Sequence, residues 1–259
     1  RERMLNLPQT PKWDIARVSH STLIHADCFD VFPFIEDKSI DAIICDLPYG
    51  TTQNKWDSVL PLDKLWNEYK RIIKPNGAII LTGSEPFTSI LITSNLKDFK
   101  YNWIWKKSKA TGFFDAKKRP LNDYETISVF YAKPPTYNPQ MIKAEKVYKR
   151  GFVKRKKSDC YGEEKDFVQI DNGLRYPKRI IEIGNADTRD IQHSTQKPIE
   201  LMEYLVKTYT NENDTVLDNT MGSGTTNLAC LKLNRKSIGI EKEKQYYDVA
   251  VRRLSEYCG

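Results

Sequence analysis

The sequence has few of the residues that build disulfide frameworks or metal centres. Its five cysteines are odd in number, none forms a Cys-x-x-Cys pair, and only three histidines are present. Since disulfide scaffolds and structural zinc sites need such pairs, we expect reduced thiols and no metal. No apolar run is long enough to cross a membrane, and the first residues lack the apolar segment of a secretion signal. These absences predict a cytoplasmic protein without a membrane partner.

Positive charge is concentrated in one stretch. The 259-residue chain carries a net charge of +7, and residues 141–157 contain eight of its 41 Lys and Arg residues but only one of its 34 acidic residues. The rest of the chain is therefore balanced, which favours a local polyanion-binding patch over a uniformly basic protein. Tyr148 and Phe152 are interleaved with these charges. That pattern favours nucleic-acid binding, although a solvated charged tail is the alternative.

An apolar run from Ile40 to Cys45 predicts a strand that is buried on both faces. The run ends at Asp46, and Pro48 and Gly50 prevent its continuation. Ligands of open α/β sheets bind just past the carboxyl ends of the strands. Asp46 is therefore a candidate ligand-binding carboxylate, and a capped turn with a solvated Asp is the alternative.

A second pattern near the end of the chain is typical of nucleotide-binding sheets. The strand Thr215–Leu217 leads into a Gly-rich turn and a helix, and the strand Ser237–Ile240 then ends at Glu241. An acid at this place can bind ribose hydroxyls. The turn is not a Walker loop and lacks the third Gly of a dinucleotide fingerprint. Its short Gly-x-Gly suits the methionyl end of S-adenosylmethionine.

These motifs resemble those of the permuted β group of DNA amino-methyltransferases, over nearly the whole chain except about residues 135–190. Asp46-Leu47-Pro48-Tyr49 is similar to the Asp-Pro-Pro-Tyr signature of that family. The other motifs follow in the order of the group: Thr195-Gln196-Lys197-Pro198, then Asp-x-x-x-Gly-Ser-Gly-Thr-Thr from residue 218, then Gly-Ile-Glu ending at residue 241. Leu47, Asn219 and Thr220 depart from the usual pattern.

The resemblance implies an α/β class I (Rossmann-like) S-adenosylmethionine-dependent methyltransferase. Its sheet would be mostly parallel and twisted with one antiparallel strand, in a single catalytic domain over residues 1–259 with circularly permuted motifs. The implied reaction moves a methyl group to the N6 amine of an adenine flipped out of double-stranded DNA. Asp46 favours adenine, since relatives that act on cytosine tend to carry Ser there. A cytosine-N4 methyltransferase, an RNA adenine methyltransferase and a catalytically silent DNA-binding relative are the alternatives.

The resemblance also implies roles for individual residues. Asp46 and the carbonyl of Leu47 would accept the N–H bonds of the target amine, in the loop that Pro48 stiffens, and Tyr49 would stack on the base. Localising the lone pair of that poor nucleophile is the chemical purpose of the two acceptors. The residues expected to bind the cofactor are Asp27, Thr195, Gln196, Lys197, Asp218, Thr220, Gly222, Ser223, Gly224, Thr225 and Glu241.

Two segments are candidates for DNA contact. Residues 135–190, which follow Lys133-Pro134-Pro135, are expected to form an inserted target-recognition region outside the sheet. The loop between the predicted strands Tyr101–Lys106 and Glu125–Tyr131 is basic and carries Phe113-Phe114, which either contact DNA or anchor the loop to the core. The expected DNA-binding residues are Lys117, Lys118, Arg119, Lys149, Arg150, Lys154, Arg155, Lys156 and Lys157. Besides double-stranded DNA, the resemblance suggests a homodimer and a cognate restriction endonuclease as partners.

Overall fold

The computed structural model describes residues 4–8, 12–50, 58–147, 171–185 and 196–259, and the backbone of 152–153 and 167–168. The chain divides into two compact units, residues 1–138 with 179–259 and residues 139–178. Across the described residues, no helix combines the length and the apolarity that a membrane span requires.

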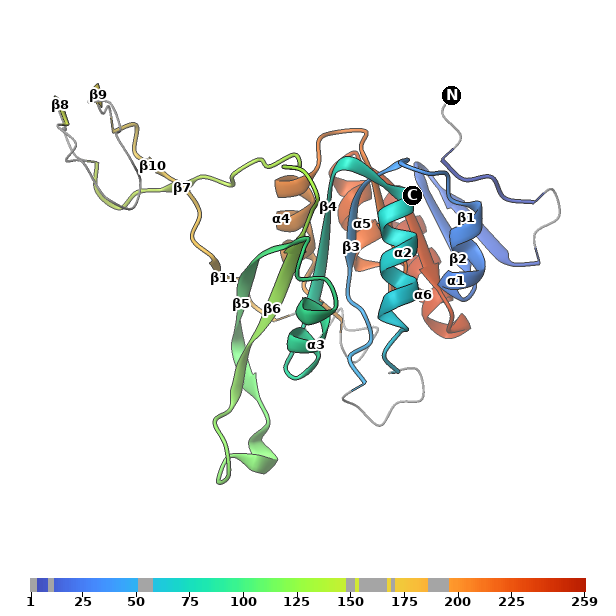
Figure 1. Ribbon diagram of the computed structural model, residues 1–259, viewed down its shortest axis with the longest axis horizontal. Coiled ribbons are helices and arrows are strands. Elements are labelled where there is room, and N and C mark those ends of the chain that lie inside the picture. The colour runs from blue at the N-terminus through green and yellow to red at the C-terminus, as the bar shows by residue number, and fades with distance from the viewer. Residues whose placement is uncertain are drawn as a thin grey trace. The chain divides into compact units, whose positions relative to one another are not determined.

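The larger unit is built on a nine-stranded sheet (Figure 1). Its strands lie in the order β1 (Asp14–Val18), β2 (Ser21–His25), β13 (Lys236–Glu241), β12 (Thr215–Asp218), β3 (Ile40–Cys45), β4 (Ile73–Gly83), β6 (Asn122–Phe130), β5 (Phe99–Thr111) and β11 (Ile180–Glu182). Strands β2, β13, β12, β3 and β4 are parallel. This arrangement confirms the mostly parallel α/β sheet expected from the sequence.

Two strands run against the others. β6 is antiparallel to both β4 and β5, as the resemblance implied. The second is β1, which forms a hairpin with β2 at the edge of the sheet. The sequence of residues 1–20, which contains two prolines, predicts an irregular lead-in, and this prediction is wrong for β1. The strand is short and no residue of it is fully buried, so its sequence lacks the apolar alternation that would predict it.

Helices cover both faces of the sheet. The helices α1 (Cys28–Val31), α2 (Leu62–Ile72) and α3 (Phe87–Ser94) pack with Ile43 and Cys45 of β3. Ala42 and Ile44 point the other way and pack with α4 (Ile199–Tyr209) and α5 (Thr225–Lys232). The last helix, α6 (Lys244–Cys258), packs on Leu23 and Leu231. β3 is thus buried on both faces, which explains its unbroken apolar sequence.

The β5–β6 hairpin is longer than its apolar residues predict, and its tip projects beyond the other strands (Figure 1). On the far side of β5, Ile180–Glu182 pairs in parallel with residues 104–106. The segment up to residue 190 was expected to lie wholly outside the sheet, and this is wrong for β11. Ile181 is buried against the sheet but flanked by exposed Ile180 and Glu182, so three residues gave no detectable period.

The smaller unit, residues 139–178, contains two short antiparallel ladders. β7 (Ile142–Lys143) pairs with β10 (Leu174–Arg175), and β8 (Phe152–Val153) pairs with β9 (Phe167–Val168). Arg175 forms a bidentate ion pair with Asp171, at 2.7 and 2.8 Å, in the turn that leads into β10. That arginine is therefore already neutralised within the unit.

Candidate active site

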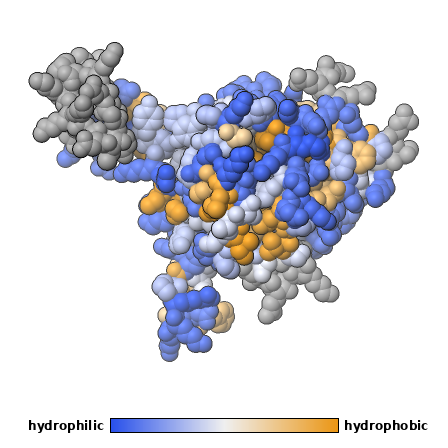
Figure 2. Space-filling view, viewed as in Figure 1, coloured by the Kyte–Doolittle hydropathy of each residue, from blue (hydrophilic) through white to orange (hydrophobic). Residues whose placement is uncertain are grey.

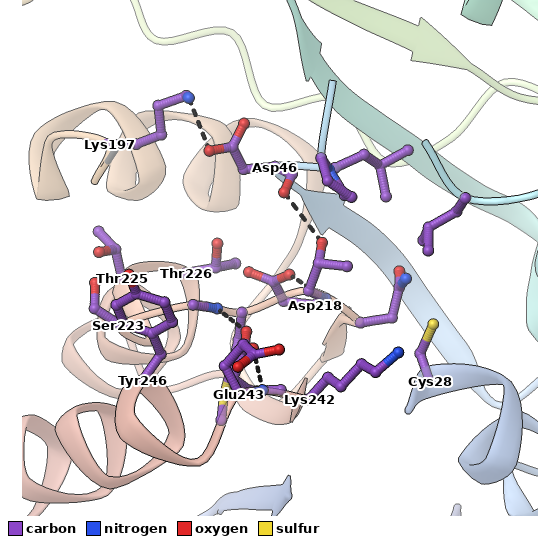
Figure 3. A pocket seen from close by; sticks show the side chains of 18 of the residues that line it. Cys28, Asp46, Lys197, Asp218, Ser223, Thr225, Thr226, Lys242, Glu243 and Tyr246 are labelled. Carbon is purple, nitrogen blue, oxygen red and sulfur yellow. Dashed lines mark hydrogen bonds and ion pairs between the residues drawn. The ribbon is translucent and has the colours of Figure 1, made fainter. Parts of the chain in front are cut away.

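A pocket lies where several parallel strands end. Asp46 follows β3, Asp218 ends β12 and Glu241 ends β13, and all three line the pocket. Figure 3 shows Lys197 pointing toward Asp46 at one end, while Lys242 and Glu243 lie at the other. The carboxyl-end rule therefore predicts the position of this pocket. We call the part around Asp46 the catalytic end and the part around Gly222 and Glu241 the loop end.

The carboxylate of Asp46 is held by three donors. Its Oδ1 atom accepts hydrogen bonds from the hydroxyls of Tyr49, at 2.7 Å, and Thr82. Its Oδ2 atom accepts one from the Lys197 ammonium, also at 2.7 Å. These three side chains therefore fix the orientation of the Asp46 carboxylate.

The network continues through two residues of the β5–β6 hairpin. Lys197 Nζ lies 3.1 Å from Glu125 Oε2, and Lys107 Nζ lies 2.6 Å from Glu125 Oε1. Lys107, Glu125 and Lys197 are each at most 11% exposed at their side chains, so the pairs are shielded from water. Lys107, which we had placed in a DNA-contacting loop, is therefore committed to an internal ion pair.

Sequence reasoning missed Thr82 and Glu125. Thr82 lies at the carboxyl end of β4, where the strand-end rule points to it. Glu125 lies in the first half of β6, and because β6 is antiparallel, that half lies beside the carboxyl end of β4. In the sequence, Glu125 is an acidic residue just before the apolar part of β6. This signal can be interpreted only when the direction of β6 in the sheet is known.

Tyr49 already has two neighbours for its ring. It stacks on Phe87 with 5.3 Å between ring centroids and an interplanar angle of 23°. The ammonium of Lys197 lies over the ring, 5.5 Å from its centroid. Burial, together with the charge of Asp46, raises the pKa of the Tyr49 phenol well above its usual value. The hydroxyl therefore stays protonated and acts as a hydrogen-bond donor.

Leu47 and Pro48 fix the loop between these residues. The Leu47 side chain is 3% exposed and belongs to the core, whereas Pro48 lines the pocket. The hydroxyl of Thr220 donates to the carbonyl of Asp46 at 3.1 Å. Thr220 therefore joins the loop end to the catalytic end through a contact that needs its hydroxyl.

The Gly-rich turn takes a shape that needs glycine. Gly222 and Gly224 have φ angles of 52° and 76°, in the left-handed region that side chains disfavour. A Cβ atom on Gly224 would lie 2.8 Å from the Cβ of Ala250 on α6. The backbone N–H of Gly222 donates to Glu241 at 2.8 Å, and the N–H of Glu243 donates to the other carboxylate oxygen at the same distance.

Arg253 of α6, which sequence reasoning missed, braces the rest of this turn. Its guanidinium donates to the carbonyl of Ser223 at 2.6 Å and to the hydroxyl of Thr225 at 3.1 Å. The Ser223 hydroxyl in turn donates to Gln196 at 2.9 Å. Ser223 and Thr225 thus shape the loop, and no periodic or strand-end signal marks Arg253 in the sequence.

Acidic groups surround the loop end. Asp27 caps α1 by accepting the N–H of Phe29 at 3.0 Å, and its other oxygen lies 3.3 Å from Lys242 Nζ. Burial raises the pKa of Asp218 to about 7, although Thr226 and the N–H of Thr220 donate hydrogen bonds to it. Burial likewise raises the pKa of Glu241. Buried carboxylates whose charge is partly uncompensated suit a cationic ligand.

The pocket fits S-adenosylmethionine on chemical grounds. The cofactor carries a sulfonium and an ammonium, which match these carboxylates, and ribose hydroxyls, which can donate to Glu241. Asn219 provides a further sign of a ligand. It is 2% exposed and lines the pocket, and among the described residues its Nδ2 has no hydrogen-bond partner. An acceptor atom of the cofactor would satisfy it.

The structure thus brings most of the expected site residues to one pocket. Asp27, Gln196, Asp218, Thr220, Gly222, Ser223, Thr225 and Glu241 line it together with the Asp46–Tyr49 loop, and Gly224 caps α5 beside it. Lys197, which we expected to bind the cofactor, also lines the pocket and forms an ion pair with Asp46. Lys117, Lys118 and Arg119 lie at the exposed tip of the β5–β6 hairpin. Thr195, Lys149, Arg150, Lys154, Arg155, Lys156 and Lys157 lie outside the described residues.

The fold and this pocket define a class I methyltransferase with an acceptor carboxylate at the end of β3. Comparison with known proteins makes the class specific. Residues 40–252 match the DNA methylase family of N6 and N4 amino-methyltransferases. The chain is 30% identical to type II methyltransferase M.HinfI of Haemophilus influenzae, over 91% of this chain and 68% of the relative. It is 29% identical to type II methyltransferase M.HpaI of Haemophilus parainfluenzae, over 92% and 75% respectively.

A solved structure agrees with these relatives. The crystal structure of an M1.HpyAVI–SAM complex has a TM-score of 0.62 and 26% identity, and the match covers 90% of this chain and 98% of that one. The chain therefore belongs to the N6/N4 DNA methylase family and is an S-adenosylmethionine-dependent DNA methyltransferase.

Proposed function

We propose that the enzyme methylates the N6 amine of an adenine that is flipped out of double-stranded DNA. The observation that carries this proposal is the carboxylate of Asp46, which directly follows β3 and is held in place by three donors. An adenine amine has two N–H bonds and a lone pair that is delocalised into the ring. Asp46 Oδ2 and the Leu47 carbonyl would accept one N–H each, which localises the lone pair on nitrogen.

The residues of this chain then act in two groups. S-adenosylmethionine supplies an electrophilic methyl group when it is bound. Glu241, the Gly222–Gly224 turn and Asn219 would hold the cofactor at the loop end, with Asp27 and Asp218 supplying negative charge. As N6 gains its bond to the methyl carbon, the bond between that carbon and the sulfonium sulfur would break, and Asp46 would stabilise the positive charge that develops on N6. The nitrogen would then lose one proton to water. Tyr49 would provide the stacking surface for the base.

We propose that two surfaces hold the DNA backbone. The β5–β6 hairpin tip exposes Phe113 at 68% and Phe114 fully, beside the exposed Lys117 and Lys118 (Figure 2). The two phenylalanines do not anchor the loop to the core, so one of our two expectations for them was wrong. Arg119 is paired with Asp115 at 2.6 Å and is less available to a phosphate. The second surface is the basic stretch of residues 141–157, within the segment of residues 135–190 that we propose as the target-recognition region.

A homodimer, a cognate restriction endonuclease and a cytoplasmic location complete the proposal. The endonuclease is suggested by the type II names of the relatives, and the location by the scattered cysteines and the DNA substrate. Light scattering of the purified protein measures the oligomeric state. A strand-cleavage assay with the neighbouring gene product, on methylated and unmethylated DNA, tests the endonuclease.

The test of the reaction is product analysis. Unmethylated DNA is incubated with the enzyme and labelled cofactor, digested to nucleosides and separated by mass. We expect N6-methyldeoxyadenosine, and modification-sensitive sequencing of the same DNA then identifies the recognition site. Label in N4-methyldeoxycytidine would contradict the choice of base, label in RNA alone would contradict the choice of nucleic acid, and no label would indicate a silent DNA-binding protein.

A further inference from the structure

The ammonium of Lys197 occupies an unusual position at the catalytic end. It donates to Asp46 Oδ2 at 2.7 Å and lies 5.5 Å from the centroid of the Tyr49 ring. The target amine requires these same two contacts, a carboxylate oxygen to accept its N–H and an aromatic ring beside it. A lysine that follows a Gln of the cofactor pocket was expected to bind the cofactor instead. Its contacts are with the residues that would receive the base.

The oxygen atoms of Asp46 show where competition arises. Oδ1 already accepts from the Tyr49 and Thr82 hydroxyls, so both of its lone pairs are used. Oδ2 accepts only from Lys197 among the described residues. An incoming amine must therefore bind the remaining lone pair of Oδ2, next to the ammonium, which also lies over the Tyr49 ring where the base would stack. Phe87, the other neighbour of the Tyr49 ring, is 1% exposed and fixed in the core, so only the ammonium can give way to a base.

We propose that Lys197 holds the place of the target amine while no base is bound, and that Glu125 receives its ammonium when the base enters. This proposal rests on the proposed function, because it assumes that Asp46 accepts the target amine. Glu125 Oε2 lies 3.1 Å from Lys197 Nζ, so a small rotation of the lysine exchanges one carboxylate for the other. Lys107 holds Glu125 in place from its opposite oxygen at 2.6 Å.

The exchange has an electrostatic consequence. While the ammonium is on Asp46, it cancels the charge of that carboxylate. Once the ammonium has moved to Glu125, the negative charge of Asp46 faces the nitrogen that becomes positive during methyl transfer. Burial disfavours a charged lysine, but the nearby charges of Asp46 and Glu125 outweigh it and raise the pKa of Lys197 well above its usual value. The lysine remains a cation in either position. While no base is bound, it stabilises the site, because without it the Asp46 carboxylate would have no cation to neutralise its charge.

A permanent positioning role for Lys197 makes different predictions. If the ammonium stays on Asp46 throughout, Glu125 only neutralises the lysine, and losing either residue lowers kcat while leaving base flipping unchanged. If the ammonium must leave, loss of Glu125 hinders base entry, and loss of the lysine relieves that defect. The two roles can therefore be separated by two measurements. A permanent role lowers kcat and leaves base flipping unchanged, whereas the exchange predicts impaired flipping and a raised KM for DNA.

The experiment compares E125Q, K197M and the double variant with the wild-type enzyme. The probe is a duplex that contains the site mapped by product analysis, with 2-aminopurine next to the target adenine, so that its fluorescence rises when that adenine leaves the stack. The KM and kcat are measured on the unmodified duplex. We expect E125Q to lose most of the fluorescence increase and to raise the KM for DNA on the order of tenfold, with kcat at saturating DNA little changed. K197M should flip the base at least as well as the wild type. The double variant should recover the flipping that E125Q loses.

K106M is the matched control, since Lys106 forms an exposed ion pair with Glu182 at 3.1 Å and should affect none of these values. Cofactor affinity by calorimetry and thermal unfolding verify that each variant is folded. Should K197M not fold, the KM and kcat of E125Q alone decide between the two roles. Normal flipping by E125Q, or a double variant no better than E125Q, would overturn the exchange. Both outcomes are distinct from failure of the proposed function, in which the wild-type enzyme makes no N6-methyladenine.

Discussion

The two ends of the pocket are built in different ways. The loop end is formed mainly by one continuous segment, residues 218–253, whose backbone N–H groups and glycine conformations define it. The catalytic end is formed by side chains from β3, β4, β5, β6 and the turn before α4, and buried ion pairs join them. The first end is thus specified by local sequence, and the second by how distant strands are ordered in the sheet. Mutations at the two ends should therefore have different signatures.

The largest effect is expected at Asp46. D46A removes the preorganised acceptor, so turnover should fall between a hundredfold and a thousandfold, about 2.7–4 kcal/mol in the barrier. Cofactor affinity should change little, because the loop end remains. Single-turnover methyl transfer and calorimetry measure the two quantities. Near-normal methylation by D46A would refute the assignment of the acceptor.

A change in stability is expected at Asp218. Its pKa in the folded protein is raised to about 7 by burial, against an ordinary value of 3.8. The folded protein therefore keeps this proton to higher pH than the unfolded chain does, so the free energy of unfolding should decrease as pH rises from about 4 to 7. The limit is about 4 kcal/mol at 1.36 kcal/mol per pKa unit. Denaturant titrations at several pH values should show this slope reduced in D218N, and an identical slope in both proteins would contradict it.

Glu241 tests the loop end. E241Q keeps the shape of the side chain but removes its charge, so cofactor affinity should fall by roughly 1.5–3 kcal/mol. Calorimetry with S-adenosylmethionine measures this loss. E243Q is the matched control, since Glu243 contacts Glu241 through its backbone N–H and that bond survives the substitution. Equal losses in both variants would show that general charge, and not the Glu241 carboxylate itself, holds the cofactor.

The smallest effects are expected at the DNA-contacting surfaces, and they compare the hairpin with the smaller unit. Each phosphate contact contributes about −0.9 to the slope of log affinity against log salt. K117A/K118A should flatten that slope by up to about 1.8 units, and alanines at Lys154, Arg155, Lys156 and Lys157 by up to about 3.6. K64A, an exposed substitution on α2, is the control. The surface whose variant leaves the slope unchanged does not hold the backbone.

The same contrast explains what the sequence could predict. The order of the motifs, the β3 and β12 strands and the glycine turn each carry a local signal, and the structure places them as expected. Thr82 carries a strand-end signal that we did not use. The contacts of Glu125 and Lys197 with the Asp46 network carry no such signal, because Glu125 reaches this network only when β6 runs antiparallel beside β4. β11 was missed because three residues are too few to show a period. Arg253 was missed because a basic residue on a helix is usually solvated.

The central claim is that the two ends of the pocket perform separate tasks. It is tested most directly by measuring single-turnover rate and cofactor affinity in D46A, E241Q and the double variant. We expect D46A to change only the rate at saturating cofactor, E241Q to change chiefly the affinity, and the double variant to show both changes added within about 0.5 kcal/mol. A double variant whose losses differ from that sum by more than about 1 kcal/mol would contradict the separation.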